Sequence, residues 1–576
     1  MIKQLAGCIG EYKKYAILTP IAMVGEVLME ILIPFIMAAI IDNGILGTAG
    51  SSYIIKMGTL MIGMAIISLM FGAFGGRFAA KASMGFSKNL RKKLFDKVQD
   101  FSFSNVDKYS TPSLVTRLTT DVTNTQNAFM MFIRMAFRAP IMLIGATAMA
   151  IIINVKLSSV FLIAIPLLGI SLYLIMTHAH PRFRAMLKLY DRMNSDVQEN
   201  LVNIRVVKAF VREDFEIKKF CASADSVRKA QVFAEKLIIL NGPLMQLSMY
   251  GCIIAILWFG GDMVMGGSFE IGKLSSFINY ITQILMSLMM ISMIFIMLVI
   301  SMASINRITE VLNEEIDIKD TASNQETTVK DGSIEFREVS FSYAKDEDNL
   351  TLSHVNLSIK SGETIGIIGG TGSSKTTLVQ LIPRLYDVLE GEVLVGGHNV
   401  KDYPLKNLRD EVAMVLQKNV LFSGTIKENL LWGNEQASEE EIIEACKSAE
   451  AHDFVMSFPK GYNTDLGQGG VNLSGGQKQR LCIARALLKK PKIVIMDDST
   501  SAVDMATDSK IRQAFKEKLS DITTIIIAQR IASVSEADRI IVLDDGKIDA
   551  FATHEELLLQ NRIYREVYDS QQKGAE

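Results

Sequence analysis

A series of long apolar runs, all in the first half of the chain, most strongly constrains what this sequence can fold into. Each run is long enough to cross a bilayer as a helix, which takes about 20 apolar residues. Lipid offers no hydrogen-bond partners, so a spanning segment must satisfy its own backbone, as a helix does. We expect six transmembrane helices, at approximately 16–41, 54–79, 129–153, 158–178, 237–261 and 274–302.

The basic residues between these runs indicate which connections face the cytosol. The stretches 80–128 and 179–236 are rich in Lys and Arg, whereas 42–53 contains neither. By the positive-inside rule, both long stretches and both termini lie in the cytosol. Both stretches show helical periodicity, and structureless loops of this length are uncommon. We therefore expect helical extensions of the spans that turn near Ser104–Pro112 and Phe210–Phe215.

Four ionisable residues fall inside the expected spans, namely Glu26, Glu30, Arg134 and Arg138. Charges at membrane depth are costly and usually face a cavity or a partner. Glu26 and Glu30 are four residues apart and share a helix face. They either line a path for cationic cargo or pair structurally with Arg134 or Arg138. We favour the structural pairing, and the cargo interpretation stays open.

The second half of the chain is polar enough for a soluble α/β domain. A chain of 576 residues exceeds what one core supports, so we divide it into a membrane domain (1–312), a linker (313–331) and a second domain (332–576). The five cysteines form no CxxC pair, which argues against a zinc site or a disulfide framework. The net charge of −2 gives no overall field that would attract nucleic acid.

A glycine-rich turn in this second domain predicts a phosphate-binding loop. The apolar strand Thr364–Ile368 precedes the turn, and Leu378–Leu385 follows it as a helix. Backbone N–H groups of such a turn converge on one point, where the positive end of the helix also lies. Lys375 is placed to reach β- and γ-phosphates, and the Thr376 hydroxyl to bind Mg²⁺. The turn consists of Gly369, Gly370, Thr371, Gly372, Ser373, Ser374, Lys375, Thr376 and Thr377, and Ser374 stands where the motif has Gly.

Other residues complete a candidate nucleotide site. Tyr343 is placed to stack on a base, and Gln417 ends an apolar run from which it can reach Mg²⁺ or an attacking water. Asp497 ends another apolar strand, where a carboxylate can hold Mg²⁺ beside Thr376. A second small-residue turn opens a helix over Lys478–Lys489 and so predicts a second anion-binding helix start. Its residues are Ser474, Gly475, Gly476 and Gln477.

In their order and spacing, these motifs resemble those of an ABC transporter nucleotide-binding domain. Further matches are Ser501–Asp504 and an Ile-Ala-Gln-Arg switch at 527–530. With six spans in front, the whole chain resembles an ABC exporter half-transporter. The resemblance implies a six-span α-helical transmembrane domain with long cytosolic helix extensions, followed by an α/β P-loop nucleotide-binding domain. It also implies two halves paired head to tail. Each ATP would lie between the phosphate loop and magnesium-binding strand (the Walker motifs) of one half and the second small-residue turn of the other, here called the LSGGQ turn (Leu473–Gln477).

Departures from the family pattern make the resemblance more specific. The family has Glu as general base where Asp498 stands, and His at the switch position where Gln529 stands. Gln468 stands where a related family stretch has Glu. With Ser374, these changes resemble the degenerate half of a heterodimeric bacterial multidrug exporter. Aspartate is one methylene shorter than glutamate, which withdraws the carboxylate by about 1.5 Å.

The resemblance implies a multi-pass protein of the bacterial cytoplasmic membrane that uses ATP and Mg²⁺ to export small hydrophobic or amphipathic cargo. Asp498, Gln529 and Gln417 would act at its slow site, and Ser474–Gln477 would complete the site of a second half-transporter. Two alternatives stay open: a homodimeric lipid or drug exporter with Asp498 as base, and an ATP-responsive regulatory subunit that pumps nothing. An importer is disfavoured, because importers of this superfamily generally keep the two domains on separate chains.

Overall fold

The computed structural model describes residues 2–320, 328–498, 505–518 and 521–573. Its described residues form two compact units, 1–99 with 111–314, and 100–110 with 315–576. The short segment 100–110, at the first of the two expected turns, therefore groups with the second unit. The motif Ser501–Asp504 lies outside the described residues.

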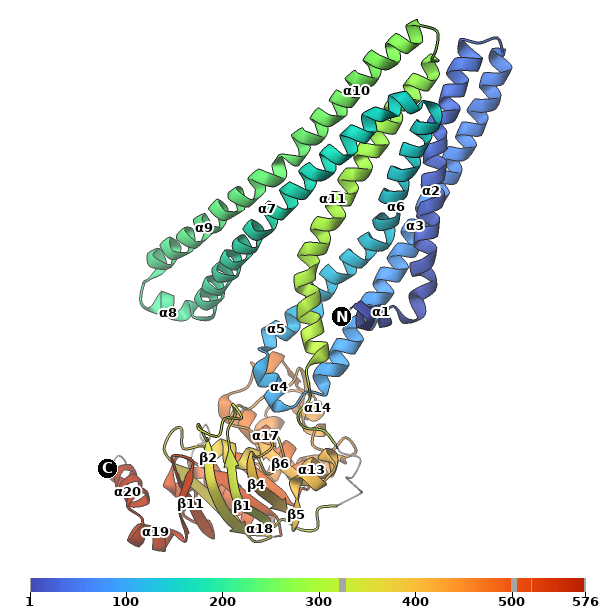
Figure 1. Cartoon of the computed structure of the whole chain (residues 1–576). Helices are drawn as coiled ribbons and strands as arrows, with labels where there is room; N and C mark the ends of the chain where they lie inside the picture. The colour runs from blue at the N-terminus through green and yellow to red at the C-terminus, as the bar shows by residue number, and fades with distance from the viewer. Residues whose placement is uncertain (1, 321–327, 499–504, 519–520, 574–576) are drawn as a thin grey trace. The chain divides into compact units, whose positions relative to one another are not determined.

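The first unit is built of helices, most of them long (Figure 1). They are α1 (Ile2–Gly7), α2 (Lys13–Ala39), α3 (Gly50–Gln99), α5 (Thr111–Thr116), α6 (Val122–Ile153), α7 (Val155–Val202), α8 (Ile204–Ala209), α9 (Glu213–Ile239), α10 (Asn241–Met265) and α11 (Ile271–Asn313). Six helical stretches among the described residues are long and apolar enough to cross a membrane, and each contains one of the expected spans. The six-span prediction is confirmed.

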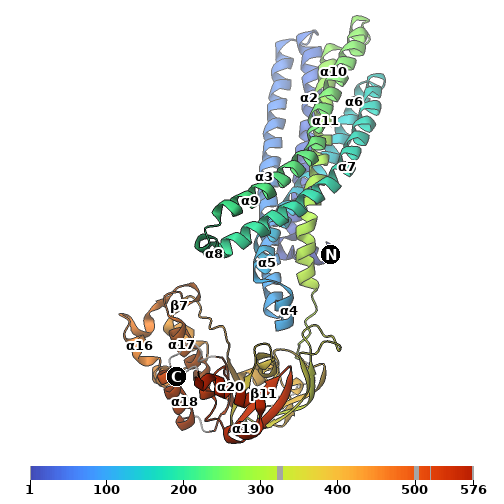
Figure 2. The ribbon, with the colours of Figure 1, turned by 90° about the vertical axis from the view of Figure 1, so that its left-hand side faces the viewer.

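Helical structure continues well beyond the apolar runs, as expected for the cytosolic extensions. Helix α3 extends to Gln99 and α7 to Val202. Helices α7 and α9 lie side by side and are joined through α8, next to the second expected turn (Figures 1 and 2). Near the end of α11, the Arg307 guanidinium donates to both oxygens of buried Asp121, at 2.8 and 2.5 Å. This bidentate pair fastens α11 to the start of α6.

The second unit is an α/β domain with two principal sheets. The six-stranded sheet has the order β12-β11-β3-β10-β9-β6, parallel except for the edge strand β12. Its strands are β3 (Thr364–Gly369), β6 (Val412–Val415), β9 (Ile493–Asp497), β10 (Thr523–Ile527), β11 (Arg539–Asp544) and β12 (Lys547–Ala552). The other sheet is antiparallel, with β1 (Ile334–Phe341), β2 (Leu352–Ile359), β4 (Glu390–Val395) and β5 (His398–Asn399).

Helices and short elements complete the second unit. They are α4 (Phe103–Lys108), α12 (Lys375–Gln380), α13 (Leu405–Glu411), β7 (Gly424–Thr425), α14 (Ile426–Leu431), α15 (Glu439–Ser448), α16 (His452–Met456), β8 (Asp465–Leu466), α17 (Gly475–Leu488), α18 (Met505–Lys518), α19 (His554–Gln560) and α20 (Arg562–Lys573). Two expected helix ranges were wrong. Helix α12 ends at Gln380 rather than Leu385, because Pro383 follows and disfavours helix before it. Helix α17 begins three residues before Lys478, where Ser474 caps it.

Candidate nucleotide site

The candidate residues gather at one edge of the parallel sheet. Strands β3, β10 and β9 are adjacent and parallel, so their carboxyl ends meet at the same edge. The phosphate loop follows β3, Asp498 follows β9, and Gln529 follows β10. Residues more than 100 positions apart in the sequence are thereby brought together, as is usual for ligand sites in open α/β sheets.

The phosphate loop has a left-handed backbone at Ser374. Its φ and ψ are 71° and 24°, and Gly372 in the same turn has a φ of 86°. For an L-residue other than Gly this conformation costs about 1–2 kcal/mol. Gly369 is required for a different reason, since a Cβ there would lie 2.2 Å from the Leu543 carbonyl oxygen. Gly370, Thr371, Gly372 and Ser373 form the rest of the turn, as expected.

Lys375 extends over the loop that precedes it. Its ammonium group donates to the carbonyl oxygens of Gly369 and Gly370, each at 2.8 Å. Burial lowers the pKa of Lys375, and the nearby carboxylates of Asp498 and Asp497 oppose that shift. The cation therefore lies where a phosphate bound by the turn would meet it.

The structure brings together two of the three expected magnesium ligands. The Thr376 hydroxyl donates to Asp497 Oδ1 at 3.0 Å, and Asp497 is only 2% exposed. Burial raises the pKa of Asp497, the Thr376 bond opposes the shift, and Asp498 adds to it. Gln417 follows β6, which pairs with β9, and its side chain is exposed. Hydroxyl, carboxylate and amide oxygens are the donors Mg²⁺ prefers, so this set fits the ion.

Asp498 is hydrogen-bonded to the switch residue. Gln529 Nε2 donates to Asp498 Oδ2 at 2.8 Å. The Asp498 backbone is itself left-handed, with a φ of 47°, and its N–H donates to the Ile527 carbonyl at 3.1 Å. Asp498 is thus held twice, at its backbone N–H by β10 and at its carboxylate by the Gln529 carboxamide.

The LSGGQ turn forms a complete helix cap. The Ser474 hydroxyl accepts from Gln477 N at 3.3 Å, and Ser474 N donates to Gln477 Oε1 at 2.9 Å. This reciprocal capping box starts α17 at Gly475, with Gly476 next in its first turn. Gln468, one of the departures, is exposed in the segment just before it. The capping box therefore gives hydrogen-bond partners to the backbone N–H groups of both Ser474 and Gln477.

Tyr343 lies in a turn just after β1, where its ring is 48% exposed. Its hydroxyl bonds the Thr377 hydroxyl at 3.0 Å, and its ring meets that of Tyr386 edge to face at 5.1 Å. Burial raises the pKa of Tyr343. The ring therefore sits over the helix that follows the phosphate loop, with area left to stack on a base.

Sequence reasoning missed several contacts of segment 100–110 with the rest of the second unit. Tyr386 donates to Asp107 at 2.5 Å, and the hydroxyls of Ser102 and Ser104 donate to Asp317 at 2.5 and 2.6 Å. These partners are more than 200 positions apart, and no spacing rule links them.

The membrane helices pair most of the ionisable residues singled out in them. Arg138 on α6 donates to Glu26 at 2.6 Å and to Glu30 at 2.9 Å, both on α2. Arg134 is exposed. The polar residues of α11 also face α2, since Tyr280 donates to the Ile31 carbonyl and Gln283 to that of Glu30. The structural interpretation holds for three of the four charges.

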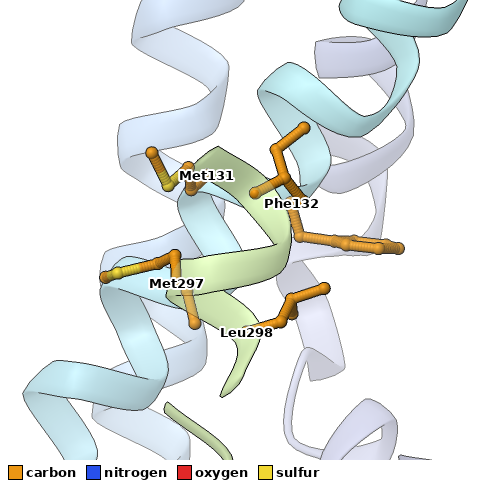
Figure 3. Close-up of a pocket in the computed structure, with 6 residues that line it drawn as sticks. Met131, Phe132, Met297 and Leu298 are labelled. Carbon is orange, nitrogen blue, oxygen red and sulfur yellow. The ribbon is translucent and has the colours of Figure 1, made fainter. Parts of the chain in front are cut away.

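A narrow apolar pocket lies between α6 and α11, with Met131 and Phe132 on one side and Met297 and Leu298 on the other (Figure 3). It has no room for a water molecule. It is therefore a packing seam between the two helices.

Comparison with known proteins decides the family. Residues 16–289 match the ABC transporter transmembrane region, and residues 352–501 match the ABC transporter ATPase domain. The ABC transporter ATP-binding protein YfiB of Bacillus subtilis is 41% identical over 97% of both chains. The chain belongs to the ABC transporter family. This transporter therefore carries a membrane-spanning region and an ATP-hydrolysing domain on one polypeptide.

Other relatives and one solved structure agree with that assignment. The transporter is 34% identical to Rv1273c of Mycobacterium tuberculosis over 98% of this chain and 97% of the relative. A Staphylococcus aureus ATP-binding/permease protein named for multidrug export is 35% identical over 84% of this chain and 83% of its own. A bacterial Atm1-family ABC exporter solved with ATP bound has the same fold, with a TM-score of 0.83 and 23% identity over 97% of this chain and 98% of that one.

Proposed function

We propose that this transporter is one half of an ATP-driven exporter of hydrophobic or amphipathic compounds across the bacterial cytoplasmic membrane. Both termini and the ATP-binding unit lie in the cytosol, as the distribution of Lys and Arg favours. The other half is a different chain. This half binds ATP but hydrolyses it slowly. Its LSGGQ turn contacts the ATP bound at the faster site of the partner and completes that site.

The hydrogen bond between Gln529 and Asp498 carries this proposal. A general base must come within about 2.6–3.2 Å of the proton that it accepts. The Asp498 carboxylate is about 1.5 Å shorter in reach than the glutamate usual in the family. One of its oxygens already accepts from Gln529 at 2.8 Å, which draws it toward the switch segment. Gln529 also has no proton that titrates near neutrality, unlike histidine.

The rest of the site supports ATP binding. Lys375, the turn over Gly369–Thr377 and Tyr343 supply phosphate and base contacts. Thr376, Asp497 and Gln417 would hold Mg²⁺, which neutralises phosphate charge when it is bound. Loss of a positioned base typically lowers a rate by about 10²–10⁴-fold while leaving binding groups in place. Binding with slow hydrolysis therefore follows from this residue set.

The cargo class rests on the membrane helices. Met286, Met289 and Met293 on α11 are each about half exposed, and methionine suits an adaptable apolar surface. Glu26 and Glu30 are already paired with Arg138, so they leave one negative charge in excess rather than two. The relative named for multidrug export points the same way.

Vesicle transport tests the proposal. The chain is co-expressed with a half-transporter from a neighbouring reading frame that has Asp-Glu at Walker B and His at the switch. The pair is then reconstituted with a lipophilic cationic dye. We expect ATP-dependent accumulation of the dye against its gradient. Dye movement that only equilibrates, with or without ATP, would instead identify a gating subunit, and full activity of this chain alone would identify a homodimer.

A further inference from the structure

The switch segment that carries Gln529 is held by a side chain from the last described helix. Gln571 Nε2 donates to the Gln529 carbonyl oxygen at 2.8 Å. Gln571 Oε1 accepts from the Ile531 N–H at 2.9 Å. One carboxamide thus satisfies a backbone acceptor and a backbone donor two residues apart. A carboxamide can do this because it carries a donor and an acceptor side by side.

The part of helix α20 that precedes Gln571 packs against the apolar core of the domain. Tyr564 is 0% exposed, and its hydroxyl lies 2.7 Å from His554 Nδ1. Val567 and Tyr568 pack against the same apolar core that contains Ile531. Tyr564, Val567, Tyr568 and Gln571 are spaced i, i+3, i+4 and i+7 and so share one helix face. The Gln571 carboxamide is therefore presented from a fixed base, about two helical turns from the buried tyrosine.

The contact fixes the backbone on both sides of Arg530. Gln571 holds the Gln529 carbonyl and the Ile531 N–H. In this backbone position the Gln529 side chain donates to Asp498 Oδ2 at 2.8 Å. Without Gln571, the segment between β10 and Ile531 loses two hydrogen bonds, and the Gln529 side chain loses its fixed starting point. A switch residue that hydrogen-bonds a terminal phosphate needs a fixed backbone position, because hydrogen bonds weaken steeply when donor and acceptor are misaligned.

We propose that Gln571 is a positioning residue for the switch, and that it makes the site respond to the γ-phosphate. This rests on the proposed function, in which ATP binds at this site, and adds to it that the Gln529 carboxamide hydrogen-bonds the γ-phosphate. Gln571 touches no nucleotide itself and acts through the Gln529 backbone. The site should consequently distinguish a nucleoside triphosphate from a diphosphate less well when Gln571 is changed.

Nucleotide affinity of the purified full chain tests this inference, with AMP-PNP and ADP as probes in Mg²⁺. We expect Gln571→Ala to weaken AMP-PNP binding by about threefold to tenfold, as for lost hydrogen bonds, and to leave ADP binding within about twofold. Gln571→Glu keeps the acceptor but places an anionic oxygen against the Gln529 carbonyl, so it should weaken AMP-PNP at least as much. Gln572→Ala is the matched control, because Gln572 is the next residue, about 100° around the helix, and exposed.

Gln529→Ala separates this inference from the proposed function. If Gln529→Ala lowers the AMP-PNP preference and both Gln571 variants leave it unchanged, the inference is overturned. An equal loss of AMP-PNP and ADP binding in the Gln571 variants also overturns it, since that indicates a general structural role. If Gln529→Ala itself leaves the preference intact, the proposed phosphate contact of Gln529 fails. A melting curve for each variant shows whether the protein is folded. If Gln571→Ala does not fold, the AMP-PNP and ADP affinities of Gln571→Glu test the inference instead.

Discussion

The phosphate loop and the LSGGQ turn are both small-residue turns that open a helix, but they are built differently. The LSGGQ turn closes on itself, with Ser474 and Gln477 capping a helix of 14 residues. The phosphate loop leads into a helix of six residues, carries a left-handed Ser374 and has no side-chain cap. The turn that we assign to the partner's ATP is locally complete, whereas the turn for this chain's own ATP is strained. This asymmetry is what a half with a weak site of its own would show.

The largest effect should come from the LSGGQ turn. Gly475→Asp places a carboxylate where the partner's ATP phosphate would lie, and we expect ATPase activity of the two-chain complex to fall by about 10²-fold or more. Lys375→Ala in this chain should cost much less, because it affects only the slow site. Steady-state ATPase assays compare the two. Equal losses of ATPase activity in the two variants would contradict the proposed difference between the two turns.

The magnesium ligand gives the next largest effect. Asp497→Asn removes the anionic oxygen, and we expect Mg²⁺-dependent ATP affinity to fall by about tenfold or more. Because burial raises the pKa of Asp497, protons should compete with Mg²⁺ at a higher pH than for an ordinary aspartate. Mg²⁺ affinity should therefore fall as the pH drops toward that raised pKa, and recover above it. Asp497→Asn should show no such dependence in a binding titration at several pH values.

Ser374 tests the strain in the phosphate loop. Gly pays no penalty for a left-handed backbone, so Ser374→Gly should relieve about 1–2 kcal/mol. If nucleotide binding draws on that strain, ATP affinity should rise by about fivefold to thirtyfold. Ser373→Gly is the matched control, since Ser373 is adjacent but is not among the residues with positive φ. Equal gains from both changes would show that the left-handed serine is not the cause.

Much of this site was predictable from the sequence, because glycine, serine and acidic residues mark turns and strand ends by local rules. The six spans follow from hydropathy, and the strain at Ser374 follows from the glycine that the motif expects. Contacts between distant segments were not predictable. Nothing near Gln571 indicates that it contacts residues 40 and 42 positions earlier, and nothing near Asp107 indicates its contact with Tyr386. Only the packing of α20 and of α4 brings those groups together.

The smallest effect concerns the cap of the LSGGQ turn. Ser474→Ala removes a capping hydroxyl, which typically costs about 1 kcal/mol. Ser438 caps α15 with the same reciprocal geometry, away from the site, and so provides a control. Both alanine variants should lower the melting temperature slightly and similarly. Only Ser474→Ala should also lower the ATPase activity of the complex, by a few-fold, and a similar loss from Ser438→Ala would remove any special role for this cap.

The most direct test of the weak site is ATP hydrolysis by the purified chain without its partner. We predict slow turnover that Asp498→Asn changes by less than about twofold, since Asp498 is badly placed as a base. The double change Asp498→Glu with Gln529→His should raise that turnover by about tenfold or more, because it restores both reach and a titratable group. Brisk hydrolysis by the unmodified chain that Asp498→Asn abolishes would contradict the account and show that Asp498 is an effective base.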